Sequence, residues 1–289
     1  MNKFCLITNE NKDINYEITN KVADYIQKNN RECILLECND SSGCGPYTDV
    51  DTIPPDTDCI VVLGGDGTIL QAVHDISNRD IPILGINIGT LGFLAEVEVH
   101  KIYEALDKVF RGEYDLVHRM MLEGRITRGK DKLYTGNVLN EIVVERSGFS
   151  RVISLAVYVN GVLANRYRGD GILVSTPTGS TGYNLSSGGP VVTSDNQVMI
   201  LTPICPHTLN SHSVVLNSND EIRVVVEISK KTQRKEVLAT FDGHEAILLQ
   251  AEDVIDIKRS KTTTKFIRFK SNNIFERLRT KLGNSEEIL

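Results

Sequence analysis

The short motif with the clearest chemical meaning is Gly64-Gly65-Asp66-Gly67-Thr68. It follows the apolar run Cys59–Leu63, which is typical of a strand buried on both faces, and it precedes a helical pattern of apolar residues. Open α/β sheets bind ligands where a strand ends and a helix begins. The glycines would let the backbone approach a bulky anion, and the helix N-terminus would offer free N–H groups.

The carboxylate of Asp66 needs a separate explanation, because it would repel a phosphate group. A carboxylate at this position suits a hydroxyl that is to be activated or a metal that is to be held. The alternative is a tight turn in which Asp66 caps the helix N-terminus.

A second candidate is the polar, glycine-rich stretch from Arg168 to Pro190, which contains Thr176-Pro177-Thr178-Gly179-Ser180-Thr181-Gly182-Tyr183. Hydroxyls and backbone N–H groups can bind ribose, phosphate and base edges, and Tyr183 could stack on a ring. Long loops without regular structure are usually functional in compact domains. The alternative is a flexible surface loop.

Two further motifs are weak by themselves. For Asn140-Glu141, an exposed polar pair at a strand bulge is the leading interpretation, and Asp242-Gly243-His244 is typical of a hairpin turn. The dinucleotide fingerprint GxGxxG is absent from every strand–helix turn, which removes the main support for a hydride-transfer Rossmann enzyme. The six histidines are dispersed, without the pairwise spacing of a metal site.

The elements that must position the first motif alternate between strand and helix. Helices are expected over Asp13–Lys28 and after Gly67, and residues 39–58 are expected to form a loop. This alternation predicts an α/β domain with a parallel sheet and flanking helices. The predicted strands are Lys3–Thr8, Cys33–Leu36, Cys59–Leu63 and Pro82–Asn87. The apolar positions of the helices are Ile14, Ile18, Val22 and Ile26, then Ile69, Leu70, Val73 and Ile76.

After about residue 112, strand signals dominate, and they predict a mostly antiparallel β-sandwich. Asn160-Gly161 gives a strong signal for a type I′ hairpin, and one helix is expected over Ile274–Leu282. We therefore expect one domain at 1–112, with residues 272–289 packing back on it, and a β domain at 113–271. The predicted strands are Leu133–Val138, Ile142–Glu145, Leu155–Val159, Val162–Ala164, Ile222–Ile228, Val237–Phe241, Ala246–Leu249, Val254–Ile257 and Phe266–Phe269.

The composition of the 289 residues excludes several classes of protein. No apolar run approaches the ~18 residues of a membrane span, and the N-terminus is too quickly polar for a signal peptide, so we expect a cytoplasmic protein. The net charge of -6 argues against non-specific nucleic-acid binding. Residues 1–100 hold 16 acidic and 6 basic side chains, whereas residues 258–289 hold 9 basic and 3 acidic ones. This asymmetry favours docking of the tail on the first domain.

Taken in order, the four motifs together with Gly169-Asp170-Gly171 strongly resemble the ATP-NAD kinase family over about residues 59–245. Lipid kinases and phosphofructokinases have similar versions of the first motif, whereas the Thr-Pro-Thr-Gly-Ser-Thr-Gly-Tyr stretch is far more specific. The resemblance implies phosphorylation of the 2′-hydroxyl of the adenosine ribose of NAD, with ATP and a divalent metal, at an active site between the domains. The alternatives are a lipid kinase and a non-catalytic dinucleotide sensor.

The resemblance also implies roles for single residues. Asp66 would accept the proton of the 2′-hydroxyl, and Asn140 and Glu141 would hold NAD. The family has an alanine more often at Gly182, which is a small-for-small difference. The other implied binding residues are Gly64, Gly65, Gly67, Thr68, Gln71, Arg151, Arg168, Asp170, Thr181, Gly182, Tyr183, Asn184, Leu185, Ser186 and His244.

No protein cage for a metal is visible in the sequence, so Mg²⁺ would enter bound to the ATP phosphates. The expected partners are the small molecules NAD and ATP, without nucleic acid or membrane. Family members are commonly dimers or tetramers, and a long β domain offers strand edges for such pairing.

Overall fold

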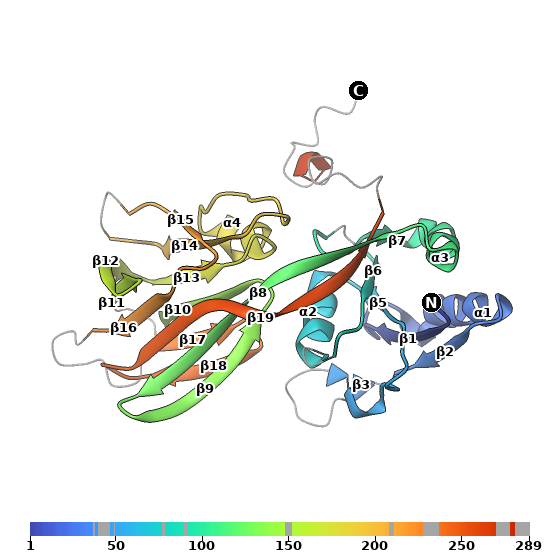
Figure 1. The fold of residues 1–289 in the computed structure, drawn as a ribbon, viewed down its shortest axis with the longest axis horizontal. Helices are drawn as coiled ribbons and strands as arrows, with labels where there is room; N and C mark the ends of the chain where they lie inside the picture. The colour runs from blue at the N-terminus through green and yellow to red at the C-terminus, as the bar shows by residue number, and fades with distance from the viewer. Residues whose placement is uncertain are drawn as a thin grey trace. The chain divides into compact units, whose positions relative to one another are not determined.

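The computed structural model describes residues 1–36, 38–39, 47–48, 50–76, 79–89, 92–147, 152–207, 211–227, 237–269 and 278–280. The chain divides into two compact units (Figure 1). The first unit comprises Met1–His118 and Thr264–Leu289, and the second comprises Arg119–Thr263. No helix among the described residues is long and apolar enough to cross a membrane.

The first unit is built on a parallel sheet with the strand order β6-β5-β1-β2. Every residue of β5 and β6 is buried, as expected for strands that are covered on both faces. A short strand, β7 (Val97–Glu98), pairs with β6 in parallel. The main strands are β1 (Lys3–Thr8), β2 (Glu32–Leu35), β5 (Cys59–Gly64) and β6 (Ile83–Asn87).

The helices of this unit are α1 (Glu17–Lys28), α2 (Asp66–Asp75) and α3 (Ile102–Arg111). The prediction that a helix begins at Asp13 is wrong. Asn15 and Tyr16 have positive φ angles, and Ile14 is 72% exposed. The buried carboxylate of Asp13 instead accepts the backbone N–H groups of Ile18 and of Thr19 in the first turn of α1. It therefore satisfies N–H groups at the N-terminus of this helix.

The second unit contains two antiparallel sheets (Figure 1). One has the order β12-β11-β16-β19, with β8 paired to β19 and β9 paired to β8. Its strands are β8 (Asp115–Arg128), β9 (Asp131–Val138), β11 (Ile153–Val159), β12 (Val162–Gly169), β16 (Ile222–Val226) and β19 (Val254–Arg268). The other has the order β15-β14-β13-β10-β17-β18. Its strands are β10 (Glu141–Arg146), β13 (Gly171–Ser175), β14 (Val198–Ile204), β15 (Val214–Asn217), β17 (Val237–Phe241) and β18 (Glu245–Leu249).

Alternate residues of the two sheets form one apolar core between them. Ile142 and Val144 of β10 belong to the same buried cluster as Leu155 of β11 and Val224 of β16. This shared core confirms the predicted β-sandwich. The hairpin at Asn160-Gly161 is also confirmed, because both residues have positive φ angles and join the paired strands β11 and β12.

Several elements differ from the predictions. The helix α3 and the strands β8, β13, β14 and β15 were not predicted, and the signals at Val254–Ile257 and Phe266–Phe269 belong to the single strand β19. The predicted loop at 39–58 contains parts of the short strands β3 (Cys38–Asn39) and β4 (Tyr47–Thr48) and a 3₁₀ turn. Apart from Leu278–Thr280, which are helical, the predicted helix Ile274–Leu282 lies outside the described residues.

The chain returns to the first unit through the end of β19. Phe266 pairs in parallel with Ile83 of β6, and Ile267 and Phe269 enter the core of the first unit. Glu96 accepts the backbone N–H of Phe269 at 2.8 Å. Core residues from both ends of the chain therefore belong to one unit.

Candidate functional site

The glycine-rich loop follows β5 and is crowded by neighbouring side chains. A Cβ added to Gly64 would lie 2.4 Å from the hydroxyl oxygen of Thr68, so a side chain does not fit there. Thr68 in turn accepts a hydrogen bond from the side-chain amide of Asn9 at 3.0 Å. A Cβ on Gly65 would lie 2.6 Å from Nζ of Lys12. The loop after β1 thus contributes an amide and a cation to the loop after β5.

Asp66 opens helix α2, but its side chain does not cap it. The N-cap is Gly65, and no side-chain cap bond is made there. The carboxylate of Asp66 instead accepts the backbone N–H groups of Phe93 at 2.7 Å and of Leu94 at 3.0 Å. The alternative in which Asp66 is a helix cap is therefore wrong. A carboxylate has about four acceptor positions, so these two bonds leave capacity for a ligand.

The topology explains why these residues meet. From β1 the chain continues to β2 on one side, whereas from β5 it continues to β6 on the opposite side. The loops that leave β1 and β5 therefore diverge, and the crevice between such loops is where open α/β sheets bind ligands. Lys12 and the start of α2 make this position favourable for an anion. Neither Asn9 nor Lys12 stands in a sequence motif, although their place directly after β1 would have indicated them.

Gln71, the remaining predicted residue on α2, is half-buried and donates to Asp75 along the same helix at 2.6 Å. Gly67 has no atom within 4 Å of an added Cβ. Among the described residues of the first unit, no contact gives either residue a role beyond the helix itself.

In the second unit, the pair Asn140-Glu141 lies at the start of β10, where its backbone is held from two sides. The carboxylate of Asp242 accepts three N–H groups, from Leu139 at 2.7 Å and from Asn140 and Glu141 at 2.9 Å each. On the other side, the carbonyl of Asn140 accepts the N–H of Thr176 at 2.8 Å.

The side chains of this pair are largely buried and incompletely bonded. Glu141 is 9% exposed, so the prediction of an exposed pair at a bulge is wrong. Among the described residues, neither Oδ1 of Asn140 nor Oε2 of Glu141 has a hydrogen-bond partner, although both atoms are buried. Burial, and to a smaller extent the negative charge of Asp242, raises the pKa of Glu141 to about 8. Two unsatisfied acceptors at one place indicate a site for a ligand with hydroxyl or N–H donors.

The polar stretch after Gly169 is not the long loop that its composition predicts. It contains the buried strand β13, a 3₁₀ turn (Gly179–Thr181) and the short helix α4 (Tyr183–Ser186). A Cβ on Gly179 would lie 2.4 Å from the carbonyl oxygen of Asn140, and one on Gly182 would lie 3.4 Å from Oε2 of Glu141. The 3₁₀ turn and the residue after it therefore pack directly on the Asn140-Glu141 pair.

Within this segment the predicted binding residues have different environments. Asn184 is 0% exposed, and its side chain bonds to the carbonyls of Ser180 and Pro190 and to the hydroxyl of Thr202. Its side chain therefore holds the segment together and is not free for a ligand. The others are half-buried or exposed, namely Thr181, Gly182, Tyr183, Leu185 and Ser186.

The remaining predicted residues have environments of their own. Asp170 forms an ion pair with Arg146 at 2.6 Å, and Arg168 is exposed on β12. His244 is exposed in the turn after β17, and Arg151 lies outside the described residues.

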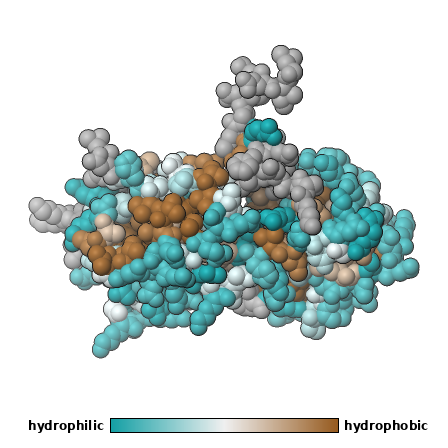
Figure 2. All heavy atoms as spheres, turned by 45° about the horizontal axis from the view of Figure 1, so that its top comes forward, coloured by the Kyte–Doolittle hydropathy of each residue, from teal (hydrophilic) through white to brown (hydrophobic). Residues whose placement is uncertain are grey.

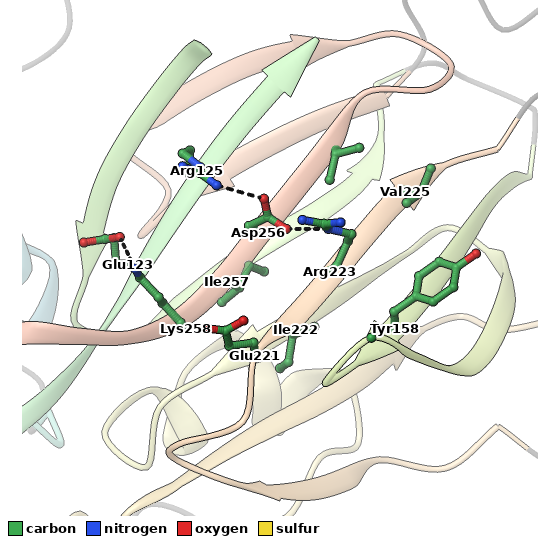
Figure 3. A pocket seen from close by; sticks show the side chains of 12 residues that line it. Glu123, Arg125, Tyr158, Glu221, Ile222, Arg223, Val225, Asp256, Ile257 and Lys258 are labelled. Atoms are coloured by element: carbon green, nitrogen blue, oxygen red, sulfur yellow. Dashed lines mark hydrogen bonds and ion pairs between the residues drawn. The ribbon is translucent and has the colours of Figure 1, made fainter. Parts of the chain in front are cut away.

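A groove of about 570 Å³ lies on the second unit and involves none of the predicted residues (Figure 3). Most of its charged side chains are already paired. Asp256 bonds to Arg223 at 2.7 Å and to Arg125 at 3.4 Å, and Lys258 lies 3.2 Å from Glu123. Among the described residues that line the groove, only the exposed Glu221 is in no ion pair, so the groove offers little for chemistry.

Comparison with known proteins agrees with the two-unit organisation. The model of the ATP-NAD kinase N-terminal domain matches residues 4–114, and that of the C-terminal domain matches residues 139–269. The chain is 46% identical to an NAD kinase of Lachnoclostridium phytofermentans over 286 residues, which covers 98% of this chain and 100% of that relative. It is 36% identical to an NAD kinase of Lachnospira eligens, covering 98% of this chain and 100% of the relative.

Solved structures show the same fold. An NAD kinase from Archaeoglobus fulgidus in complex with ATP aligns with a TM-score of 0.75 at 25% identity, covering 97% of this chain and 98% of the other. Yeast NADH kinase complexed with NADH aligns with a TM-score of 0.79 at 22% identity, covering 100% of this chain and 89% of the other. The fold and these matches define a phosphotransferase with an α/β unit and a β-sandwich unit. The chain belongs to the ATP-NAD kinase family, which confirms the resemblance inferred from the motifs.

The raised pKa of Glu141 predicts a specific pH dependence of stability. The folded chain binds this proton more tightly than the unfolded chain, whose glutamate titrates near 4.5. The stabilisation from Glu141 should therefore be complete below about pH 4.5 and be lost as the pH rises through about 8. Glu141→Gln should not show this loss. Over this pH range, the free energy of unfolding of the variant should therefore rise relative to that of the wild type by at least about 1.4 kcal/mol.

Denaturant unfolding of the ligand-free chain at a series of pH values measures this difference. Glu245→Gln is the matched control, because Glu245 is exposed in the adjacent turn region at the start of β18. Parallel pH profiles for wild type and Glu141→Gln would show that Glu141 titrates normally.

Proposed function

We propose that this chain transfers a phosphoryl group from ATP to the 2′-hydroxyl of the adenosine ribose of NAD, giving NADP. Membership of the ATP-NAD kinase family and the NAD kinases among its relatives support this function over the lipid-kinase and sensor alternatives. The observation that carries it is the pair of unsatisfied buried acceptors on Asn140 and Glu141. A ribose with two adjacent hydroxyls supplies two donors for such a pair.

Asp66 is proposed as the base. A ribose hydroxyl is a poor nucleophile, and a carboxylate within hydrogen-bond reach both orients it and accepts its proton. The bonds from the N–H groups of Phe93 and Leu94 fix the orientation of this carboxylate, so it does not have to reorganise during the reaction. Asp66 belongs to the first unit, and the Asn140-Glu141 pair belongs to the second.

The divalent metal is proposed to enter with ATP. Among the described residues, no group of three His, Cys, Asp or Glu side chains is placed to hold a metal. The donor set fits an ion, with Mg²⁺ as the proposal, that is bound chiefly by phosphates, with Asp66 as the carboxylate beside it. When bound, such an ion neutralises phosphate charge.

The other residues are assigned from the family resemblance together with their environments. The segment Thr181–Ser186 is proposed to contact the nucleoside, with Asn184 shaping the segment instead of contacting it. Arg168 and Asp170 are proposed to lie near the dinucleotide. Gln71, Arg151 and His244 remain predictions from the resemblance alone.

Domain organisation and location also remain proposals. We expect the basic C-terminal segment to pack on the acidic first domain, and the ion pair between Lys265 and Asp80 at 2.6 Å supports this. A cytoplasmic location is the expectation for an enzyme whose substrates are the soluble molecules ATP and NAD.

One coupled assay tests the function and the base together. Purified chain with ATP, magnesium and NAD should form NADP, which an NADP-specific dehydrogenase detects. Asp66→Asn should lower turnover at least about a hundredfold while the Kd for NAD stays unchanged, because proton acceptance is lost and NAD contacts are kept. Asp24→Asn, at an exposed position of α1, is the control. Phosphorylation of a lipid without NADP formation would refute the function, and near-normal turnover of Asp66→Asn would remove Asp66 from the base role.

Lys12 is proposed to neutralise donor phosphate beside the glycine-rich loop, because its Nζ approaches Gly65 at the start of α2. Lys12→Ala should raise the KM for ATP about tenfold, the loss of one charge-assisted hydrogen bond, with the KM for NAD changed less than about twofold. Lys28→Ala, at the far end of α1, is the control. Steady-state kinetics with each substrate varied measures the split, and an unchanged KM for ATP would contradict the role.

A homo-oligomer, either a dimer or a tetramer, is proposed from the strand edges of the second unit. The end strands β12 and β15 carry Val162 at 71% and Val215 at 51% exposure, and Figure 2 shows apolar surface on this unit. Light scattering should give at least twice the chain mass of 32.1 kDa. Val215→Lys should lower that mass, whereas Val99→Lys in the first unit should not. A wild-type mass of one chain would contradict the proposal.

A further inference from the structure

The carboxylate of Asp242 does more than its position in a hairpin turn requires. Asp242 and Gly243 have φ angles of 50° and 73°, which the Asp-Gly turn between β17 and β18 explains. The turn does not explain why the side chain points inward. It is 8% exposed and accepts N–H groups from three consecutive residues about one hundred positions earlier in the chain.

Three consecutive N–H groups cannot reach one carboxylate from a regular strand, because successive groups of a strand point to opposite sides. The backbone at Leu139–Glu141 is therefore bent around the Asp242 carboxylate, between the end of β9 and the first pairs of β10. The N–H of Asp242 in turn donates to the carbonyl of Glu141 at 3.0 Å, so each of the two segments both donates and accepts hydrogen bonds. This concave arrangement of N–H groups is a typical anion-binding nest, filled here by a side chain of the same chain.

The carbonyl groups of this bend are bound by Thr176. Its hydroxyl donates to the carbonyl of Leu139 at 2.6 Å, and its N–H donates to the carbonyl of Asn140 at 2.8 Å. The backbone of the pair is thus fixed by Asp242 from one side and by Thr176 from the other. The acceptors that remain open are on the side chains, at Oδ1 of Asn140 and Oε2 of Glu141.

We propose that Asp242 is a positioning residue for NAD, whose carboxylate fixes the backbone of Leu139–Glu141 so that Asn140 and Glu141 present their open acceptors to the nucleoside hydroxyls. The inference rests on the proposed function and adds to it a residue that does not itself contact the substrate. Asp242 also acts on Glu141 through charge. Among the described residues, it is the charged group that shifts the Glu141 carboxyl, since the segment packed on that carboxyl presents the uncharged Gly182.

The near-isosteric change Asp242→Asn alters both the backbone contacts and the charge. The amide oxygen can keep the bonds that Oδ1 accepts from Asn140 and Glu141, but the amide nitrogen would meet the N–H of Leu139, donor against donor. The negative charge beside Glu141 is lost at the same time. Asp242→Ala would instead leave three N–H groups unpaired and is a worse test, since it endangers folding.

The experiment compares full-length wild type and Asp242→Asn by steady-state kinetics and by calorimetric titration with NAD. We expect the KM and the Kd for NAD to rise at least about tenfold, with the KM for ATP changed less than about twofold. The pH midpoint for NAD binding should move to lower pH, because the neighbouring negative charge that raises the Glu141 pKa is gone.

Two further variants complete the test. Thr176→Val releases the same backbone from its carbonyl side without changing charge, so it should raise the KM for NAD without moving the pH midpoint; it also serves if Asp242→Asn does not fold. Asp220→Asn is the matched control, because Asp220 likewise accepts a backbone N–H, from Asn217, in a turn of the second unit, and it should change neither quantity.

An unchanged KM for NAD and an unmoved pH midpoint in Asp242→Asn would overturn the inference, as would equal losses for NAD and ATP, which a merely structural role predicts. Failure of the proposed function is distinguishable, because it appears in the wild type alone as absence of NADP. In that case the ligand-free pH profile of unfolding still tests the effect of Asp242 on Glu141.

Discussion

Carboxylates that accept backbone N–H groups from distant segments hold the candidate site of each unit in shape. Asp66 binds the N–H groups of Phe93 and Leu94, and Asp242 binds those of Leu139, Asn140 and Glu141. Such charge-assisted bonds are short and directional, and they fix the backbone just beyond the ends of the strands. The loops that carry the candidate chemistry are therefore fixed by hydrogen bonds to side chains distant in the sequence.

The electrostatics of the two units are complementary to different parts of a dinucleotide reaction. The first unit combines Lys12, the N-terminus of α2 and the oriented carboxylate of Asp66, which suits phosphate and a hydroxyl that loses its proton. The second unit combines the buried acceptors of Asn140 and Glu141, which suits neutral hydroxyl donors. The raised pKa of Glu141 fits an unsatisfied acceptor, since a hydroxyl that donates to Oε2 would favour the charged form of this carboxyl.

Much of the architecture could be predicted from the sequence. Buried parallel strands such as β5 are continuous apolar runs, and the Asn160-Gly161 hairpin has a local turn signal. The glycine-rich motif after β5 was likewise visible, because glycine requirements are local. Asn9, Lys12 and Phe93 could not be found in this way, since their roles depend on contacts across the sheet edge. Asp242 was interpreted as a turn residue for the same reason: the turn is a local property, and the three N–H groups that it binds come from far away in sequence.

The discontinuity of the first unit has a consequence for how the chain folds during synthesis. The second unit is encoded between the two parts of the first, so all of its residues are synthesised before Ile267 and Phe269. The core around Phe4 and Leu84 is therefore completed only after these last strand residues have been made. A ribosome that stops before residue 264 releases a chain whose first unit lacks part of its core, so an incomplete product is open to proteolysis at its N-terminal end.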